Sequence, residues 1–288
     1  MGQNSKIEWT HHTFNPWWGC AKVSAACRSC YAESWAKRVG QDLWGKKAPR
    51  RTFSAAHWRE PLRWNSEAEH ESERRRVFCA SMADVFEDRE DLAPWRSRLW
   101  DLINQTPWLD WLLLTKRPHM VGKSVPWTTQ WPVNVWLGTT VESQYWAVKR
   151  IPELLKHPAH IRFLSCEPLL TKLDLTQWLS GIDWVIAGGE SGARARPMHP
   201  LWAQSLRDQC VTRNVAFHFK QWGHWAPNAG SSKRAIVEIP DETGNATKLF
   251  GVGKAAAGRV LDGRTWDQVP TNTARDGPHE ERTDVAAV

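Results

Sequence analysis

Three cysteines lie close together near the start of the chain, in the stretch WWGCAKVSAACRSCYAES at residues 17–34. Cys20, Cys27 and Cys30 have the spacing C-x6-C-x2-C, which allows three thiolates from one loop to meet at a metal centre. A structural zinc ion requires a fourth protein ligand from elsewhere in the chain. An iron–sulfur cluster held by three thiolates keeps one iron open for a substrate or cofactor. The spacing alone leaves zinc, an iron–sulfur cluster and unligated cysteines open.

Length and composition indicate a cytoplasmic protein of one large or two small domains. The chain has 288 residues and six cysteines, too few for a dense disulfide framework. Its first residues, Met1–Lys6, are polar and do not resemble a secretory leader. The sequence contains no run of about eighteen apolar residues that could span a bilayer. The three clustered cysteines are therefore expected to be reduced, and to act as ligands or catalysts.

The remaining chain alternates between strand-like and helix-like segments. Mainly apolar runs, typical of strands buried on both faces, occupy residues 77–83, 109–115, 133–139, 161–166, 183–187 and 215–219. Helical spacing of apolar residues marks 92–105, 144–156 and 200–213, and a further helix is expected to begin at Tyr31. This alternation predicts an α/β fold with about six parallel strands, as a barrel or an open doubly wound sheet.

Polar or charged residues follow every one of these strands. They are Asp84, Lys116, Arg117, Thr140, Glu142, Glu167, Gly188, Gly189, Glu190, Lys220 and Gln221. Parallel α/β folds place their chemistry at the carboxyl ends of the strands. A single charged residue there is most simply part of a surface ion pair. The whole set, however, predicts that these residues line one common site.

Two segments interrupt the alternation. Residues 40–76 are charged and turn-rich, and are expected to be an insertion or lid after the cysteines. Residues 224–288 form a C-terminal extension rich in Gly, Ser, Pro and charge, predicted to be disordered from about residue 271. The predicted barrel therefore covers residues 1–223.

Charge and tryptophan content favour an anionic partner. The net charge is +7, and 21 residues are tryptophan. Trp44, Trp58 and Trp64 lie beside Lys or Arg, an arrangement that suits phosphate binding and base stacking. The run Arg74–Arg76 is expected to add to this patch. The alternative interpretations are core packing for the tryptophans and a solvated surface for the charges.

Several stretches carry a resemblance to known proteins. They are FNPWWGC, CRSCYAE, VFCASMADVF, LLTKRP, WLGTTVES, RFLSCEPLL, WVIAGGESG, ARPMHPLW, FKQWG and LDGRTWDQVP, in order from about residue 8 to 270. The chain resembles the radical S-adenosylmethionine (SAM) superfamily and, more closely, the phage Gp37/Gp68 family of radical-SAM-like proteins. The resemblance implies a partial (β/α) barrel of the radical SAM type with a [4Fe–4S] cluster on Cys20, Cys27 and Cys30.

The resemblance also implies that the open iron chelates SAM and that an electron donor reduces the cluster. Two features depart from the usual superfamily pattern: the first cysteine gap is six residues long, and the GGE string follows a late strand. We therefore assign the SAM contacts to a set that includes the exit of the first strand after the cysteines. This set is Tyr31, Ser81, Asp84, Gly188, Gly189 and Glu190.

The basic, Trp-rich insertion and the strand-exit cations favour DNA or a nucleotide as the substrate. We expect Lys116, Arg117, Arg194 and Arg196 to bind it and Glu142, Glu167 and Lys220 to be catalytic. The phage context favours isomerisation or hypermodification of a modified thymine in DNA. A DNA-repair reaction like that of spore photoproduct lyase is the alternative. A zinc-stabilised, non-catalytic nucleic-acid-binding protein is the alternative of another class.

Overall fold

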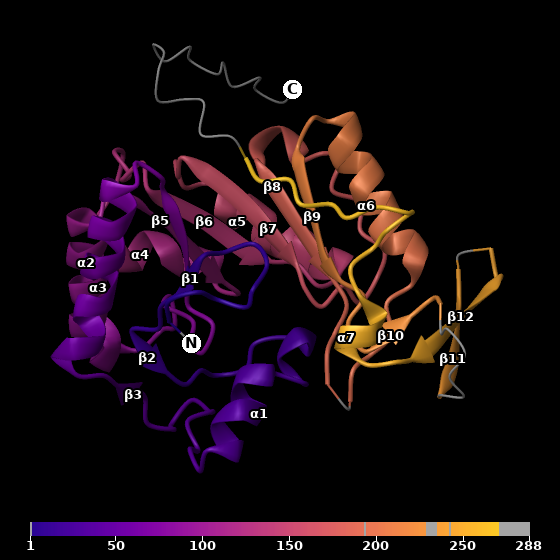
Figure 1. Cartoon of the computed structure of the whole chain (residues 1–288), viewed down its shortest axis with the longest axis horizontal. Helices are drawn as coiled ribbons and strands as arrows, with labels where there is room; N and C mark the ends of the chain where they lie inside the picture. Colours follow the sequence, from indigo (N-terminus) through magenta and orange to yellow (C-terminus); the bar gives the residue numbers. More distant parts are fainter. Residues whose placement is uncertain (1, 193, 229–234, 242, 271–288) are drawn as a thin grey trace.

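The computed structural model describes residues 2–192, 194–228, 235–241 and 243–270. Seven parallel strands form one curled sheet, a half-barrel, in the order β1-β4-β5-β6-β7-β8-β9 (Figure 1). They are β1 (His12–Thr13), β4 (Arg75–Cys79), β5 (Leu109–Thr115), β6 (Val135–Thr140), β7 (Ile161–Cys166), β8 (Trp184–Gly188) and β9 (Ala216–Gln221). The predicted partial α/β barrel is confirmed. The strand that the sequence did not reveal, β1, is two residues long and too short to produce a pattern.

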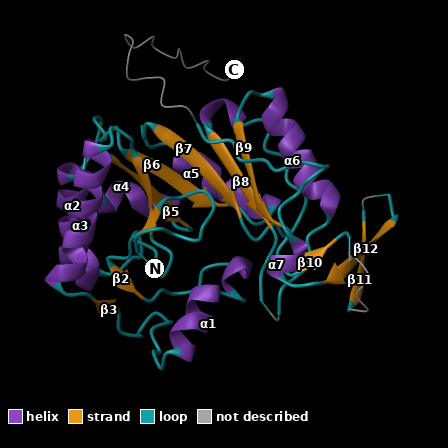
Figure 2. Cartoon of the chain, in the orientation of Figure 1, coloured by secondary structure: helices purple, strands orange, loops and turns teal. Residues whose placement is uncertain are grey.

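Helices cover the outer side of the curled sheet (Figure 2). They are α2 (Ala55–His70), α3 (Ala93–Gln105), α4 (Val121–Ser124), α5 (Gln144–Leu155) and α6 (Pro200–Thr212). The large core lies between them and the sheet, and joins helix residues such as Leu99 and Leu206 to strand residues such as Leu113 and Val185. The predicted helices at 92–105, 144–156 and 200–213 are confirmed, as is the start of α1 (Tyr31–Arg38) at Tyr31.

Residues 40–76 contain the helix α2, which belongs to the helical layer of the half-barrel. Trp58, Pro61, Trp64 and Ala68 recur at helical spacing and are buried, and α2 packs against α3, β4 and β5. Trp58 and Trp64 are 3% and 0% exposed, so the expectation that they stack on bases is wrong. Their rings pack against the sheet. The polar residues between them made this segment look like a loop in the sequence.

The inner side of the half-barrel has its own aromatic core. Trp9, Phe78, Trp136, Phe163 and Trp184 pack together there, and the Trp9 and Phe78 ring centroids are 4.7 Å apart. A Cβ atom added at Gly138 would lie 2.4 Å from the Phe163 ring, so only glycine leaves room for that side chain. These rings form an apolar floor beneath the carboxyl ends of the strands.

The C-terminal extension covers the edge strand β9. The N–H of Phe219 donates to the carbonyl of Trp266 at 2.9 Å, and His218 pairs with Asp267. Covering the edge protects it against pairing with another chain. The tail that we predict to be disordered from about residue 271 lies outside the described residues.

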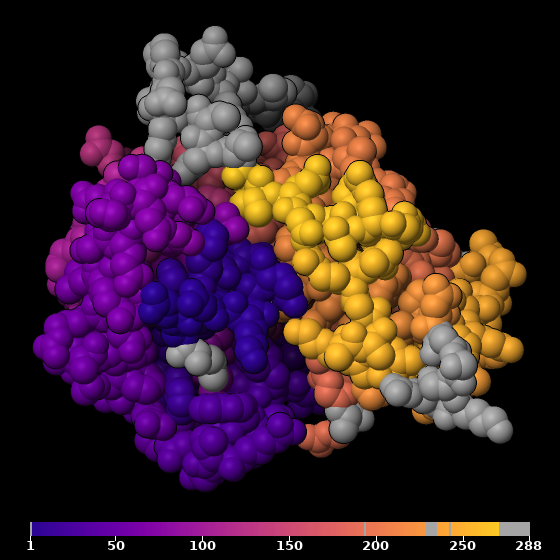
Figure 3. Space-filling model, viewed as in Figure 1, coloured from indigo at the N-terminus to yellow at the C-terminus, as the bar shows by residue number. Residues whose placement is uncertain are grey.

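The smaller elements lie around the rim of the half-barrel. They are the sheet of β10 (Trp225–Ala226), β12 (Ala246–Gly251) and β11 (Ile236–Pro240), the helix α7 (Lys254–Ala257), the pair β2 (Trp17–Trp18) and β3 (Arg51–Thr52), and the 3-10 helices η1 (Ala25–Cys27), η2 (Glu90–Leu92), η3 (Pro118–Met120) and η4 (Leu179–Gly181). The N-terminal and C-terminal segments meet on one face (Figure 3), where Lys254 pairs with Glu8 at 3.8 Å.

In the described part of the chain, no helix has the length and apolar character needed to cross a membrane.

Candidate active site

A cavity of about 460 Å³ lies at the carboxyl ends of the strands, on the apolar floor. All three clustered cysteines line it, together with most of the predicted strand-exit residues. The predicted residues in its wall are Cys20, Cys27, Cys30, Tyr31, Ser81, Asp84, Lys116, Arg117, Gly189, Glu190, Glu167 and Lys220. The parallel sheet thus brings residues together that are up to two hundred positions apart in the chain.

The cysteine loop, residues 20–30, is anchored to the exit of β4. Gly19 has φ +113° and donates its N–H to the carbonyl of Met82, and a Cβ atom there would lie 2.6 Å from the carbonyl of Leu43. Glycine is therefore required where the chain turns into the loop. After the loop, Ala32 and Ala36 of α1 pack on Met82. Both ends of the cysteine loop are thus held at the same strand exit.

Burial governs the chemistry of the thiols in the cysteine loop. All three are free, and burial raises the pKa of Cys20 to about 12. Burial also raises the pKa of Cys30, although the backbone N–H groups of Ala32 and Glu33 donate to its sulfur and act in the opposite direction. Without a cation the two groups are neutral thiols, and a bound metal would favour their ligating thiolate form.

The three clustered thiols line one cavity. Among the described residues, no three His, Cys, Asp or Glu side chains stand close enough together to hold one metal ion. This placement of the thiols would fit a cluster held by three thiolates with one open iron. The other cysteines, Cys79, Cys166 and Cys210, are buried in strands or in α6.

Asp84 and Arg117 link the cysteine loop to the sheet. Arg117 Nη1 donates to Asp84 Oδ2 at 2.7 Å and lies 3.8 Å from Cys20 Sγ, and its Nη2 donates to the carbonyl of Ala21 at 2.7 Å. Thr115 Oγ1 and the Lys116 N–H also donate to the Asp84 carboxylate. Asp84 is therefore fully engaged within the protein, and Arg117 places a positive charge beside Cys20.

Two lysines bring positive charge into the cavity from opposite strands. Lys220 Nζ is 2.8 Å from Glu167 Oε2, and the two side chains are 19% and 13% exposed. Lys116 Nζ donates to Thr140 Oγ1 at 3.2 Å and has no carboxylate partner among the described residues. Lys116 is thus available to an anionic group, whereas Lys220 shares its charge with Glu167.

Glu190 and Gly189 lie where β8 leaves the sheet. Arg196 donates to both oxygens of Glu190, from Nε at 2.9 Å and from Nη2 at 2.5 Å. A Cβ atom at Gly189 would lie 1.9 Å from the carbonyl of Trp222. The glycine is therefore required for close packing of two backbones, and the Glu190 carboxylate is neutralised by Arg196.

Four predicted site residues lie outside the cavity wall. Arg196 is directed to Glu190, and Arg194 is exposed, with its carbonyl accepting from Ser29 Oγ at 3.5 Å. Gly188 is buried, and a Cβ atom there would lie 3.2 Å from Glu167 Oε2. Glu142 is 0% exposed and paired with Arg150. In contrast to the prediction, Glu142 therefore does not face the cavity.

The structure adds residues that the sequence did not single out. Lys254 comes from the C-terminal extension and lines the cavity, and no local pattern connects it with the strand exits. Asn15 is 3% exposed, and its Oδ1 accepts the N–H of Met82 at 2.7 Å. Asn15 lies in the FNPWWGC stretch, where a buried amide next to the cysteines was a usable signal.

The basic run Arg74–Arg76 does not form the expected nucleic-acid patch. Arg74 pairs with Asp110, Arg75 pairs with Glu71, and Arg76 Nε donates to the carbonyl of Trp9. They lie at or just before the start of β4, at the opposite end of the strand from the cavity. Their contacts within the protein leave them poorly placed to bind DNA beside the cysteines.

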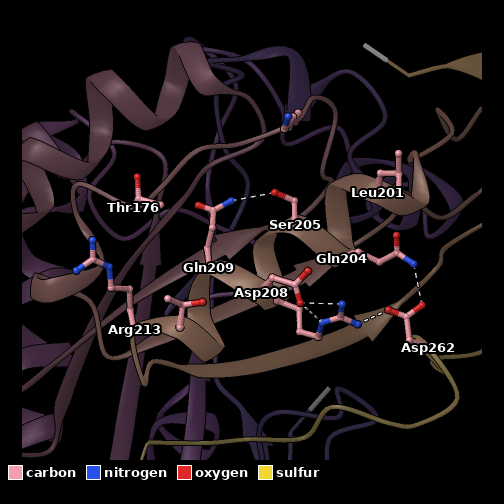
Figure 4. A pocket seen from close by; sticks show the side chains of 11 residues that line it. Thr176, Leu201, Gln204, Ser205, Asp208, Gln209, Arg213 and Asp262 are labelled. Atoms are coloured by element: carbon pink, nitrogen blue, oxygen red, sulfur yellow. Dashed lines mark hydrogen bonds and ion pairs between the residues drawn. The ribbon is translucent and has the colours of Figure 1, made fainter. Parts of the chain in front are cut away.

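A second, wider hollow of about 910 Å³ lies along the outer side of α6 (Figure 4). Its wall includes Gln204, Asp208, Gln209 and Asp262, and Arg207 pairs with both aspartates. None of the predicted site residues lines it. The chemistry-bearing residues are therefore concentrated in the smaller cavity inside the half-barrel.

Comparisons with known proteins give one family and a distant structural likeness. Comparison with curated protein sequences gave no match. Two solved structures of spore photoproduct lyase, one with a cysteine replaced and one with a tyrosine replaced, have TM-scores of 0.46 and 0.43 and identities of 12% and 10%. Each alignment covers 87% of this chain and 71% of that chain. The resemblance to the phage Gp37/Gp68 family stays a prediction. A family model matches residues 4–270, and the chain thus belongs to the family described as "Protein of unknown function (DUF5131)".

Proposed function

We propose that the cavity binds a [4Fe–4S] cluster on Cys20, Cys27 and Cys30 together with SAM, and that the protein is a radical SAM enzyme acting on a base of DNA. The observation that carries this proposal is the convergence of three free thiols from one loop with the strand-exit charges around one cavity. Three thiols with no fourth protein ligand in the described part of the chain suit a cluster with one open iron. The motif resemblance described above supports SAM as the second cofactor.

When bound and reduced, the cluster and SAM would supply a radical that removes hydrogen from a substrate carbon. The chain's own residues would bind and orient the substrate and would shield the cavity from water. Arg117 holds the carbonyl of Ala21 and the side chain of Asp84, and so fixes the start of the cysteine loop. The aromatic floor, which includes Trp9 and Phe78, closes the cavity from below and limits the access of water.

The cationic groups of the cavity favour an anionic substrate. Lys116 has no carboxylate partner among the described residues and would bind a phosphate or carboxylate. Lys220 and Glu167 would orient the substrate, with Glu167 able to accept a proton from a group next to the reacting carbon. A base within duplex DNA would have to be flipped out to enter the cavity. Isomerisation of an adduct on a modified thymine is the reaction that we favour.

The first experiment tests the cofactors. The protein is reconstituted anaerobically with iron and sulfide, its metal content is measured, and SAM and dithionite are added while 5′-deoxyadenosine is followed by mass spectrometry. We expect about four irons per chain and formation of 5′-deoxyadenosine. Alanine at Cys20, Cys27 or Cys30 should abolish both, whereas matched variants at Cys79, Cys166 and Cys210 should retain the iron. Stoichiometric zinc without 5′-deoxyadenosine would instead support a non-catalytic nucleic-acid-binding protein.

The second experiment tests the substrate. Oligonucleotides that carry an amino-acid adduct on the thymine methyl, a thymine photoproduct or unmodified thymine are supplied to the reconstituted enzyme. Rearrangement of the adduct would support hypermodification, and cleavage of the photoproduct would support repair. Faster reaction of single-stranded or mismatched DNA would agree with base flipping. Full activity on a mononucleotide, with no gain from polymeric DNA, would contradict action on DNA.

A further inference from the structure

A buried ion pair lies directly beneath the cysteine loop. Arg150 of α5 donates from Nη1 to Glu142 Oε2 and to the carbonyl of Thr140, both at 2.8 Å. The two side chains are 3% and 0% exposed. The guanidinium carbon of Arg150 is 3.9 Å from the centroid of the Trp146 ring. The pair is thus held by the β6–α5 unit and is cut off from solvent.

The other oxygen of Glu142 reaches the cysteine loop. Its Oε1 accepts the N–H of Ala26 at 3.4 Å, and Ala26 lies in η1, next to Cys27. Ala26 also lines the cavity. One carboxylate therefore connects a buried cation with the backbone that presents one of the three thiols.

Arg150 has more donors than partners. Its Nε and Nη2 atoms are buried and have no hydrogen-bond partner among the described residues. A buried charge without full compensation is costly, so a structural role alone would favour a fully satisfied or an apolar pair at this site.

We infer that Glu142 and Arg150 are a positioning pair, which fixes Ala26 and Cys27 and balances the charge beneath the metal centre. Glu142 performs the first task through the Ala26 N–H, and it performs the second by neutralising Arg150. A cluster becomes more negative on reduction, so a net positive charge beneath Cys27 would raise its reduction potential. The statement about the potential rests on the proposed function, whereas the statement about the loop does not.

Two substitutions at Glu142 separate the two tasks. Glu142→Asp keeps the charge but shortens the side chain, which withdraws the carboxylate from Ala26. Glu142→Gln keeps the length but offers one acceptor oxygen to the Ala26 N–H and Arg150 Nη1 together, and it leaves Arg150 without its counter-charge. Asp110→Asn is the matched control, because Asp110 is 4% exposed and paired with Arg74 near the start of β5, at the end of the strand away from the cavity.

The loop is tested in the protein without metal, by amide hydrogen exchange of the peptide that contains Ala26. Glu142→Asp should exchange about fivefold faster there, as expected for the loss of one hydrogen bond. Glu142→Gln should exchange at a rate between those of Glu142→Asp and the wild type, because its one acceptor oxygen is shared between Ala26 and Arg150, and Asp110→Asn should match the wild type. Equal exchange in all four proteins would overturn the positioning role.

The charge is tested in the reconstituted protein, by a redox titration monitored by electron paramagnetic resonance. Glu142→Gln should shift the cluster to a more positive potential, whereas Glu142→Asp and Asp110→Asn should leave it within error of the wild type. An unchanged potential in Glu142→Gln at full iron content would overturn the charge-balancing role. If the wild type bound no cluster, the proposed function would fail, and the exchange result would still decide the role of Glu142 in the loop.

Discussion

Three histidines with lowered pKa values should make the fold unstable in mild acid. Burial, reinforced by neighbouring cationic groups, lowers the pKa of His11, His12 and His218 from 6.5 to about 4. The N–H of Arg76 donates to His11 Nδ1 at 2.8 Å, and the N–H of Asn4 donates to His12 Nδ1 at 3.3 Å. Both bonds require an unprotonated ring nitrogen. The folded protein therefore keeps these rings neutral at a pH where the unfolded chain protonates them.

The size of the effect follows from the two pKa values. Between pH 6.5 and 4 the unfolded chain binds protons that the folded chain does not, so the free energy of unfolding falls as the pH falls. At pH 5 each histidine with a folded pKa of about 4 lowers that free energy by about 2 kcal/mol relative to pH 8. His12 and His218 are 5% and 2% exposed, and together they should lower it by about 4 kcal/mol. His11 is less buried and should contribute less.

Urea unfolding followed by tryptophan fluorescence, from pH 8 to pH 4.5, measures this dependence. The free energy of unfolding should be nearly constant from pH 8 to 7 and should then fall steeply. His218→Gln should lower stability at pH 8 through lost packing, but should make the decline between pH 6 and 5 shallower by about a third to a half. His119→Gln, at an exposed site, should leave the slope unchanged. Equal slopes in wild type and His218→Gln would refute the reasoning.

Three further predictions concern the cavity. Glu167→Gln breaks the pair with Lys220 and should lower turnover by about a hundredfold at normal cluster content. Normal turnover would contradict its role, and Glu153→Gln, in an exposed pair with Lys156, is the control. Gly189→Ala should destabilise the fold by about 1–3 kcal/mol in thermal unfolding, because its Cβ would clash with the carbonyl of Trp222; an unchanged melting temperature would argue against that close approach. DNA binding should weaken with salt, and Lys116→Ala should make the log–log slope shallower by about 0.9, whereas salt-independent binding would exclude a phosphate anchor.

Much of the fold could be predicted because an apolar run of strand length is stable as a strand buried on both faces of a sheet. The runs at 109–115 and 161–166 coincide with β5 and β7, since strands buried on both faces can contain few polar residues. The helix α2 was missed although Trp58, Trp64 and Ala68 recur at helical spacing, because its exposed face carries most of its residues. A short strand such as β1 gives no pattern, and only its pairing with β4 defines it.

The sequence by itself identified most of the charged groups around the cavity, and the tertiary structure excluded Glu142, added Lys254 and decided which of the groups are free. Cys20, Asp84, Lys116 and Glu167 meet because the carboxyl ends of parallel strands share one edge of the sheet. Their partners depend on the reach and burial of individual side chains, which no spacing encodes. Only the folded chain directs Arg117 to Asp84, Arg196 to Glu190 and Arg150 to Glu142. It also leaves Lys116 without a carboxylate partner among the described residues. The Asp84 carboxylate is paired with Arg117, because a buried charge needs a counter-charge.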